Sequence, residues 1–405
     1  MRNSRSSRLL LVAVMLGLLI SACGDDAGSD TTGADTTGAD TTEAGAPTTT
    51  ATAPDDGGED GGSIQESCDV VDQWKAAPSE WTGPSSAPTP PGDIRVALIS
   101  VQEITEGSAR ATRAAKEAAE AIGWEADILD GQGTTDGALA AINAAVDGGY
   151  DAITLTFIDP STVSEAVNRA LDAGMPVVTL GVPPYTPERA EYDQIPDSSH
   201  DWILTGEIIG HYMICRSEGD VNALLLNGAE TVVVLHGQFA GSYEVLTDPE
   251  LCPGCEVTEE RFSLATIDTQ TPQLAVSGLQ ANPDLNWVWC YDFCLAQVAT
   301  RLQADGLDEE VLGAGFDCNA QNIQLIKDGV VQVVCIADPR NWEAWATIDI
   351  VNRLLNGEEP VQQSIPVRLF DDANADEFTE EDIQEGWQGG FDFRSEYLSI
   401  WAAES

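Results

Sequence analysis

Few residues of this 405-residue chain are spaced in a way that could support catalysis. The three histidines, His200, His211 and His236, are scattered and lack the HExxH-like spacing that binds a catalytic zinc ion. Cys252-Pro-Gly-Cys255 has the spacing of a redox motif or half a zinc site, but no second CxxC follows it. The sequence therefore predicts a protein that is not an enzyme and that has no metal site and no cofactor.

Residues at the ends of the predicted strands suit binding better than catalysis. They are rich in carboxylates, which accept hydrogen bonds, and in aromatic rings, which stack on flat apolar faces. They include no evident nucleophile–base pair. In parallel α/β sheets, ligands bind beyond the carboxyl ends of the strands. The strand-end candidates for ligand binding are Gln102, Glu103, Thr105, Phe157, Asp159, Asn227, Tyr291, Asp292, Asp317 and Asp338.

The elements that position these residues alternate along the chain. Strands are predicted at 94–100, 125–130, 152–157, 177–180, 222–227, 256–263, 286–291, 311–316 and 331–336. Helices are predicted at 108–122, 138–147, 162–173, 201–216, 230–247, 271–281, 293–305, 319–328 and 341–356. This alternation is typical of parallel sheets covered by helices. About 310 structured residues exceed one comfortable core, so two α/β lobes are expected.

The N-terminus has the features of a bacterial export signal. Arg2, Arg5 and Arg8 precede an uncharged apolar run at 9–20. That run is too short to span a bilayer, which needs about 20 apolar residues. The segment 20–23, Ile-Ser-Ala-Cys, resembles the lipobox of bacterial lipoproteins, in which the cysteine becomes residue one and carries a lipid. We therefore expect residues 1–22 to be removed and Cys23 to anchor the chain to a membrane; the alternative is a plain secretory signal with an incidental thiol.

The remaining cysteines are best explained as disulfides. Eight follow Cys23, and an even number in an exported chain favours pairing. Cys252–Cys255 and Cys290–Cys294 would be local pairs. Cys318 and Cys335 end neighbouring predicted strands, so a bridge between them is sterically reasonable. Cys68–Cys215 is then left by elimination.

The segment that follows the export signal is unlike the rest of the chain. Residues 23–63 contain a repeat of Thr-Thr-Gly-Ala-Asp and no aromatic residue, so they predict a disordered acidic spacer. Residues 64–92 place Trp74 and Trp81 among prolines. They are expected to form an extended arm across the folded domain, pinned by Cys68.

The chain is strongly acidic. It has 18 Lys and Arg against 68 Asp and Glu. Removal of the three arginines of the export signal leaves 15 against 68, a formal charge near −53. Such a surface repels nucleic acid, which excludes a DNA-binding regulator.

Several motifs follow one another in a fixed order. They are an alanine-rich helix ending in Gly123-Trp124, the segments 149–153 (GYDAI) and 173–178 (AGMPVV), the turn Asp159-Pro160, the tripeptide Gly315-Phe316-Asp317, the segment 326–329 (IKDG), and Asp338-Pro339. Together they resemble the type I periplasmic binding proteins of sugar ABC importers. The resemblance covers residues 93–370, and it depends on the number and order of the motifs because each is weak alone.

The resemblance implies two Rossmann-like lobes with parallel sheets, joined by three crossing strands near 196–200, 338–341 and 358–365. It assigns 93–198 and 340–358 to the first lobe, 199–339 and 359–372 to the second, and 373–405 to a C-terminal extension. It also implies that the hinge closes over a small solute, which is then delivered to a membrane permease.

The resemblance also bears on the site. Asp317 matches the family's sugar-binding aspartate, and Tyr291-Asp292 stands where the family has Asn-Asp. Gln238 replaces an arginine, Asp338 replaces a glutamine, and Gly181-Val182 replaces Asp-Arg. The site is therefore expected to carry carboxylates without arginine, which favours a neutral or cationic solute. A sugar or polyol is favoured over a nucleoside or amine.

Each candidate also has a plainer interpretation. Asp317 could be a solvated turn residue, Asp292 an N-cap, and Phe157 part of a lobe core. Gln238 could simply be exposed. Trp342 is a further ligand candidate, but core packing or hinge contact is favoured for it.

The sequence thus predicts a monomeric, lipid-anchored solute-binding protein on the outer face of the cell membrane, with an ABC permease as its partner. A sensory lipoprotein that presents its ligand to a membrane receptor would have the same fold and is the main alternative. An exported α/β enzyme is the third possibility.

Overall fold

A computed structural model describes residues 60–402, apart from 79, 184, 186, 229–232, 264–265 and 310. All of these residues belong to one compact unit, Asp55–Ser405. The predicted export signal, Cys23 and nearly all of the 23–63 spacer lie outside the described residues. None of the helices that the structure describes is long and apolar enough to cross a membrane.

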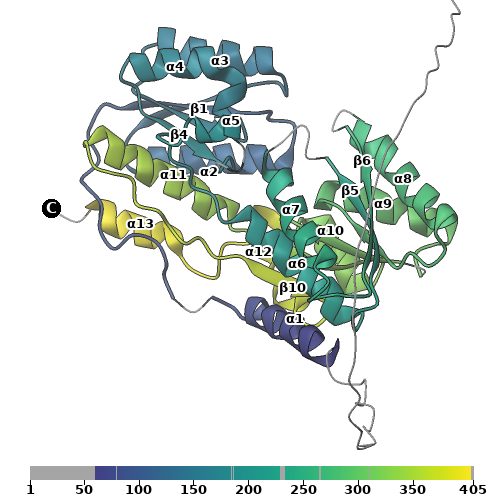
Figure 1. Cartoon of the computed structure of the whole chain (residues 1–405). Helices are drawn as coiled ribbons and strands as arrows, with labels where there is room; N and C mark the ends of the chain where they lie inside the picture. The colour runs from purple at the N-terminus through teal and green to yellow at the C-terminus, as the bar shows by residue number, and fades with distance from the viewer. Residues whose placement is uncertain are drawn as a thin grey trace, which may run out of the picture. The chain divides into compact units, whose positions relative to one another are not determined.

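The first lobe is built on a parallel sheet with the strand order β2-β1-β3-β4 (Figure 1). Its strands are β1 Arg95–Ser100, β2 Glu125–Asp130, β3 Ala152–Thr156 and β4 Val177–Leu180. Helices α2 Glu106–Ala121 and α11 Arg340–Leu355 cover one face, and α3 Thr135–Asp147 and α4 Ser164–Asp172 cover the other. Because β1 and β3 are buried on both faces, their sequences are nearly continuous apolar runs.

The second lobe has a larger sheet with the strand order β10-β9-β8-β7-β5-β6. Five of its strands run parallel: β5 Asn222–Asn227, β6 Glu256–Arg261, β7 Trp287–Trp289, β8 Leu312–Phe316 and β9 Gln332–Ala337. The strand β10 Arg368–Asp371 is antiparallel to β9 and was not predicted. The helices of this lobe are α6 Trp202–Arg216, α7 Val233–Thr247, α8 Ile267–Ala281, α9 Asp292–Asp305 and α10 Ala320–Asp328. The predicted α/β fold class is confirmed, with shifts of a few residues at the element ends.

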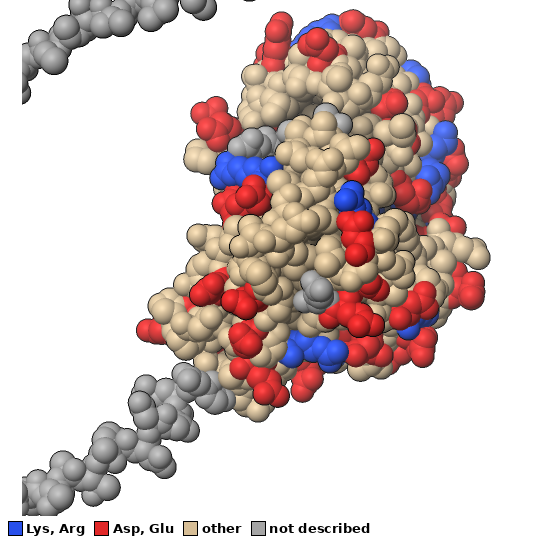
Figure 2. Space-filling view, turned by 90° about the vertical axis from the view of Figure 1, so that its right-hand side faces the viewer, with Lys and Arg blue, Asp and Glu red and all other residues tan. Residues whose placement is uncertain are grey.

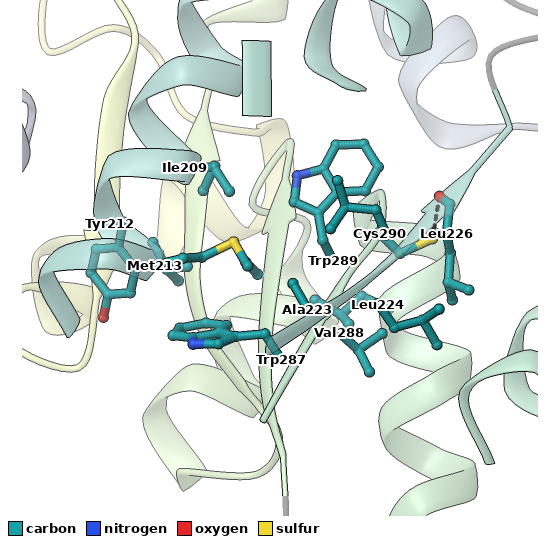
Figure 3. Close-up of a cluster of buried hydrophobic side chains, with 14 of the residues drawn as sticks. Ile209, Tyr212, Met213, Ala223, Leu224, Leu226, Trp287, Val288, Trp289 and Cys290 are labelled. Carbon is teal, nitrogen blue, oxygen red and sulfur yellow. Dashed lines mark hydrogen bonds between the residues drawn. The ribbon is translucent and has the colours of Figure 1, made fainter. Parts of the chain in front are cut away.

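Two tryptophans of β7 organise the core of the second lobe (Figure 3). Trp287 and Trp289 point to the side of α6, and Val288 between them points to the opposite side, as the period of a strand requires. All three side chains are fully buried. The Trp287 ring meets Tyr212 of α6 edge-on at 6.3 Å between centroids, and Trp289 Nε1 donates to Ser242 Oγ at 2.9 Å. The strand next to the candidate site is therefore held rigidly.

The chain passes between the two sheets three times. The first pass precedes α6, the second separates β9 from α11, and the third, residues 356–367, separates α11 from β10. Apart from one parallel bridge between Thr179 and Asp197, the passes are made by chain outside the sheets.

The arm predicted as extended over 64–92 begins instead as a helix. Helix α1, Asp60–Lys75, lies against α6 and β10 (Figure 1). Ile64, Cys68 and Val71 recur at helical spacing and face the second lobe, where Val71 is buried and Cys68 is bonded to Cys215. Packing on the lobe thus stabilises a helix that the acidic sequence alone did not suggest. The described residues of 76–92, which exclude Ser79, form neither helix nor strand.

The C-terminal extension is folded. It contains the short helices η3 Ala375–Glu377 and α12 Glu380–Glu385, and then α13 Phe393–Ala402, which packs on α11 (Figure 1).

All four cysteine pairs expected from the sequence are bonded in the structure. They are Cys68–Cys215, Cys252–Cys255, Cys290–Cys294 and Cys318–Cys335.

Acidic side chains are more frequent than basic ones on the face that Figure 2 draws. Figure 2 shows Asp and Glu spread over the face that is drawn, with far fewer Lys and Arg between them. This distribution agrees with the formal charge of −50 and gives no basic surface on that face for nucleic acid.

Candidate ligand-binding site

Three predicted residues come together around a cation that the sequence prediction missed. Phe157 follows β3 of the first sheet, whereas Asp317 and Asp338 follow β8 and β9 of the second. Arg340 Nη2 lies 2.9 Å from Asp338 Oδ2 and 3.4 Å from Asp317 Oδ1. The Arg340 guanidinium carbon is 5.1 Å from the centroid of the Phe157 ring. We call Phe157, Asp317, Asp338 and Arg340 the strand-end cluster, because it joins strand ends of both sheets.

The presence of Arg340 corrects the expectation of a site without arginine. This residue opens α11 directly after the second pass, so the fold carries it between the lobes. Its guanidinium also lies 4.9 Å from the Trp202 ring centroid and 3.0 Å from Glu343 Oε2. Burial by itself would lower the pKa of Arg340, but Asp338, Glu343 and Asp317 outweigh that effect and raise it. Arg340 therefore stays charged, and its planar fork can stack and bind carboxylates together.

Glu343 links this cation to the first pass of the chain. Its Oε1 accepts the backbone N–H of His200 at 3.0 Å and lies 2.6 Å from His200 Nδ1. Burial alone would raise the pKa of Glu343, but the charges of Arg340 and His200 and the hydrogen bonds from His200 lower it to about 2. Glu343 is thus ionised, and it holds the first and second passes together.

Asp338 has the opposite shift. Its complete burial raises the pKa to about 7, and the neighbouring carboxylates of Asp317 and Glu343 act in the same direction. The charges of Arg340 and His200 lower it only in part. The carboxyl of Asp338 therefore exchanges its proton near neutral pH.

Phe157 explains one departure from the family pattern. Its backbone lies in the left-handed region at φ 57°, which is strained for an aromatic residue. The ring lies over Gly181, where an added Cβ would meet Phe157 Cε1 at 2.2 Å. Gly181 itself has φ 77°. The phenyl ring thus fills the space that a side chain at 181 would need.

A second cation also joins the lobes. Arg110 of α2 donates from Nη2 to Asn319 Oδ1, the N-cap of α10, at 3.2 Å. Neither residue was predicted from the sequence, because their contact depends on how the two lobes meet.

Several other candidates face lobe interiors and have no contact with the strand-end cluster's ring or guanidinium among the ring and ion-pair contacts of the described residues. Asp292 is fully buried, and its carboxylate accepts Asn319 N–H at 2.8 Å and Gln332 Nε2 at 3.0 Å. Burial, followed by the Asp317 charge, raises its pKa well above the usual value. Trp342 is fully buried and stacks between Trp81 and Phe393. The plainer interpretation, core packing, holds for Trp342.

Three further candidates of the second lobe are engaged within that lobe. Tyr291 packs on Phe262 and Trp289, and its hydroxyl donates to the Leu235 carbonyl at 3.3 Å. Asn227 donates to Glu259 Oε1 at 2.8 Å. Gln238 is buried on α7, so the alternative that it is exposed is wrong.

The candidates of the first lobe stay nearer the surface. Thr105 is exposed and is the N-cap residue of α2, while Asp159 caps η1 Pro160–Val163 by accepting Ser161 N–H at 2.8 Å. Glu103 accepts Thr112 Oγ1–H at 2.9 Å, and Gln102 lies over Gly133. In the part of the chain that the structure describes, none of these four residues forms a hydrogen bond to the strand-end cluster.

A hollow of about 350 Å³ lies beside the first pass of the chain. It is lined by Tyr185, Asp197 and Asp201, with His200 at its boundary and Gln362 from the third pass. Its volume is at the lower end of the range for ligand pockets, about 300–1000 Å³. Through His200 and Glu343 it adjoins the strand-end cluster.

The contact between Phe157 and residue 181 gives a first prediction. Gly181→Ala should destabilise the fold by about 1–3 kcal/mol, because the added methyl meets both the phenyl ring and a left-handed backbone. Gly174→Ala is the matched control: it has the same φ, 77°, and no described atom lies within 4 Å of its Cβ position. Urea unfolding should show a larger loss in the free energy of unfolding for Gly181→Ala than for Gly174→Ala. In a Phe157→Ala background this difference between the two variants should disappear. If Gly181→Ala costs the same free energy of unfolding in the Phe157→Ala background as in the parent, the steric account is contradicted.

The pKa of Asp338 gives a second prediction. Between about pH 4 and 7 the folded chain retains a proton that the unfolded chain has lost, so this group makes the free energy of unfolding fall as pH rises. Asp338→Asn removes that dependence. The stability of the variant relative to the parent should therefore rise by about 1–3 kcal/mol between pH 5 and 8. The measurement is urea unfolding at each pH, with the fully exposed Asp376→Asn as control. A difference that stays constant with pH would refute the assignment.

Known proteins share this architecture. The chain matches the family model described as periplasmic binding protein domain over residues 98–359. It is 23% identical over 261 residues to the ribose import binding protein RbsB of Salmonella typhimurium, covering 63% of this chain and 82% of that protein.

Two solved structures show the same fold. One is an ABC transporter solute binding protein from Agrobacterium vitis with bound allitol, at TM-score 0.64 and 18% identity, covering 71% of this chain and 99% of that chain. The other, from Actinobacillus succinogenes with bound D-allose, has TM-score 0.62 and 18% identity, covering 70% and 100%. The family model spans well over half of the chain. The protein is therefore a member of the periplasmic binding protein family, and it has the type I fold of these two structures.

Proposed function

We propose that this chain is the extracytoplasmic solute-binding component of an ABC importer, which closes around a sugar or polyol and delivers it to a permease. The observation that carries this proposal is the strand-end cluster, where the Phe157 ring after a strand of the first sheet meets Asp317 and Asp338 after strands of the second, with Arg340 between them. A ligand bound there would touch both lobes and so stabilise their closed arrangement.

The charges of the cluster favour a neutral, hydroxyl-rich solute. Arg340 already donates from both terminal nitrogens to carboxylates, so the carboxyl groups are the main acceptors left for a ligand. The Asp317 side chain is 39% exposed and can accept hydrogen bonds from hydroxyl groups. Asp317, Asp338 and Glu343 place three carboxyl groups around the one guanidinium of Arg340, so an anionic solute would meet repulsion when Asp338 is ionised.

The named ligands of the relatives agree with this solute class. Ribose is named for the Salmonella protein, and allitol and D-allose are bound in the two structures. All three are neutral and carry several hydroxyl groups. We infer the same chemical class of ligand for this chain. The loops in which this chain differs from those relatives would determine which individual sugar binds.

Ligand binding can be tested by thermal unfolding of the chain without its export signal. Ribose, allose and allitol form the neutral set, and gluconate and ribose 5-phosphate form the anionic set. A neutral ligand at about 100 times its Kd should stabilise the fold by about 2.7 kcal/mol and raise Tm, whereas the anions should not. Asp317→Ala should remove the shift, because it deletes the exposed acceptor.

Asp376→Ala is the matched control, since that carboxylate is fully exposed and lies outside the cluster. It should leave every shift unchanged. A full shift in Asp317→Ala would show that the solute binds elsewhere, with the hollow beside Tyr185 as the next site to test. Stabilisation by gluconate equal to that by the neutral set would refute the charge argument.

We also propose that Cys23 carries a lipid that holds the protein at the membrane. The support is the N-terminal sequence: a basic start, an apolar run, and a cysteine after small residues. A lipidated residue with two or more acyl chains anchors stably, because each buried CH₂ contributes about 0.8 kcal/mol.

Fractionation of cells tests the anchor. The parent should sediment with membranes, and Cys23→Ser should move to the soluble exported fraction. Ser21→Ala, which keeps a small residue before the cysteine, should remain with the membranes. Retention of Cys23→Ser in the membrane fraction would overturn the anchor.

A further inference from the structure

Two terminal segments connect the lobes in addition to the three passes. We call residues 76–92 the strap and residues 372–402 the tail. Both lie outside the region that the family model matches, residues 98–359. Both are held to each lobe by packed or hydrogen-bonded contacts.

The strap begins from an end fixed on the second lobe. Helix α1 is joined to α6 by the Cys68–Cys215 disulfide. At its last residue, Lys75 Nζ lies 2.6 Å from Asp371 Oδ2, and the Lys75 carbonyl accepts Arg368 Nε–H at 2.9 Å. Both partners belong to β10. The strap therefore starts from a point that moves with the second lobe.

The other end of the strap is fixed on the first lobe. Trp81 stacks on Trp342 of α11 at 4.7 Å between centroids and 8° between planes. Further along, Asn352 Nδ2 donates to the Pro88 carbonyl at 2.8 Å, and Trp124 Nε1 donates to the Pro91 carbonyl at 2.8 Å. Only residues 76–80 separate Lys75 on one lobe from Trp81 on the other.

The tail crosses in the opposite direction. Phe378 and Trp387 pack edge-on against Phe370 of β10, at 5.2 and 6.2 Å between centroids. After that, Arg394 Nε bonds Glu117 Oε1 of α2 at 2.8 Å, and Trp401 Nε1 bonds Asp349 Oδ1 of α11 at 2.9 Å. The tail thus begins on the second lobe and ends on the first.

The tail crosses the gap over a very short length. Trp387 packs in the second lobe, and Gly389, two residues further on, lies so close to Trp342 that a Cβ would be 2.7 Å from its ring. Two residues of extended chain reach about 7 Å. The strap and tail also touch, since Trp81 meets Tyr397 edge-on at 5.4 Å. Lobe separation at this place is limited by the length of chain unless a packed contact breaks.

We propose that the strap and tail form a clamp that restricts opening of the two lobes. Hinge proteins of this kind release their ligand by moving the lobes apart. With the clamp in place, the lobes stay close together even without solute, and opening needs slack in both segments. The proposal does not depend on which solute binds.

Insertion of slack tests the clamp directly. Eight Gly and Ser residues are inserted after Ala77 in the strap, and eight more after Gln388 in the tail. These insertions keep every contact partner and add only flexible length. The control carries the same insertion after Pro283, an exposed turn residue between α8 and β7.

Pulsed electron–electron resonance then measures the lobe distance without added solute. Spin labels are attached through non-canonical residues at Asp172 of α4 and Ala304 of α9, both exposed, so that no new thiol is present. The parent and the control should give one narrow distribution at the same distance. The slack variant should shift the mean to longer distance and broaden it.

Identical distributions in the slack variant and the parent would overturn the clamp, and so would a broad, long-distance distribution in the parent. If the insertions prevent folding, the double variant Trp81→Ala/Trp387→Ala is measured instead, because it removes the stack that holds the strap to α11 and the ring contact that holds the tail to β10. The same lengthening is expected from it, and its absence would equally overturn the proposal.

Discussion

The structure of the site depends on one buried guanidinium. Arg340 pairs with the carboxyl groups of Asp317, Asp338 and Glu343 at once, and its guanidinium carbon lies 5.1 Å from the Phe157 ring centroid and 4.9 Å from the Trp202 ring centroid. Each lobe contributes to this arrangement. Removing the cation would leave carboxylates buried and uncompensated, which is far costlier than never having buried them. The network therefore fixes where the passes of the chain lie and how the strand ends face each other.

This constraint also shapes the chemistry that a ligand can meet. Phe157 covers Gly181, so a residue with a side chain is excluded at that strand end. The carboxyl groups of the strand-end cluster, Asp317 and Asp338, both follow strands of the second sheet. The opposite pKa shifts of Asp338 and Glu343 arise in one network, because burial dominates for the first and the adjacent cation for the second. The polar residues that stabilise the contact between the lobes are thus the same residues that could bind a solute.

Most of the fold was predictable because its signals are local. Apolar runs and helical periodicity located the strands and helices. Short spacing suggested Cys252–Cys255 and Cys290–Cys294, neighbouring strand ends suggested Cys318–Cys335, and Cys68–Cys215 followed by elimination. The site was only partly predictable. Asp317 and Asp338 were found from their place after strands, but Arg340 was missed because its role depends on contacts between distant segments. Asp292 follows a strand too, yet its side chain points into the lobe, where it accepts hydrogen bonds from Asn319 and Gln332. Helix α1 was missed because its apolar positions are sparse in an acidic stretch.

The disulfide between α1 and α6 has a mechanical consequence. Tension applied at the N-terminal end of the chain reaches the folded body at Cys68, where it passes through a covalent bond into Cys215 of α6. Only the first turns of α1, before Cys68, can unwind under such a pull. The force is then carried by the second lobe, so that the strap and the first lobe beyond it are shielded from the load.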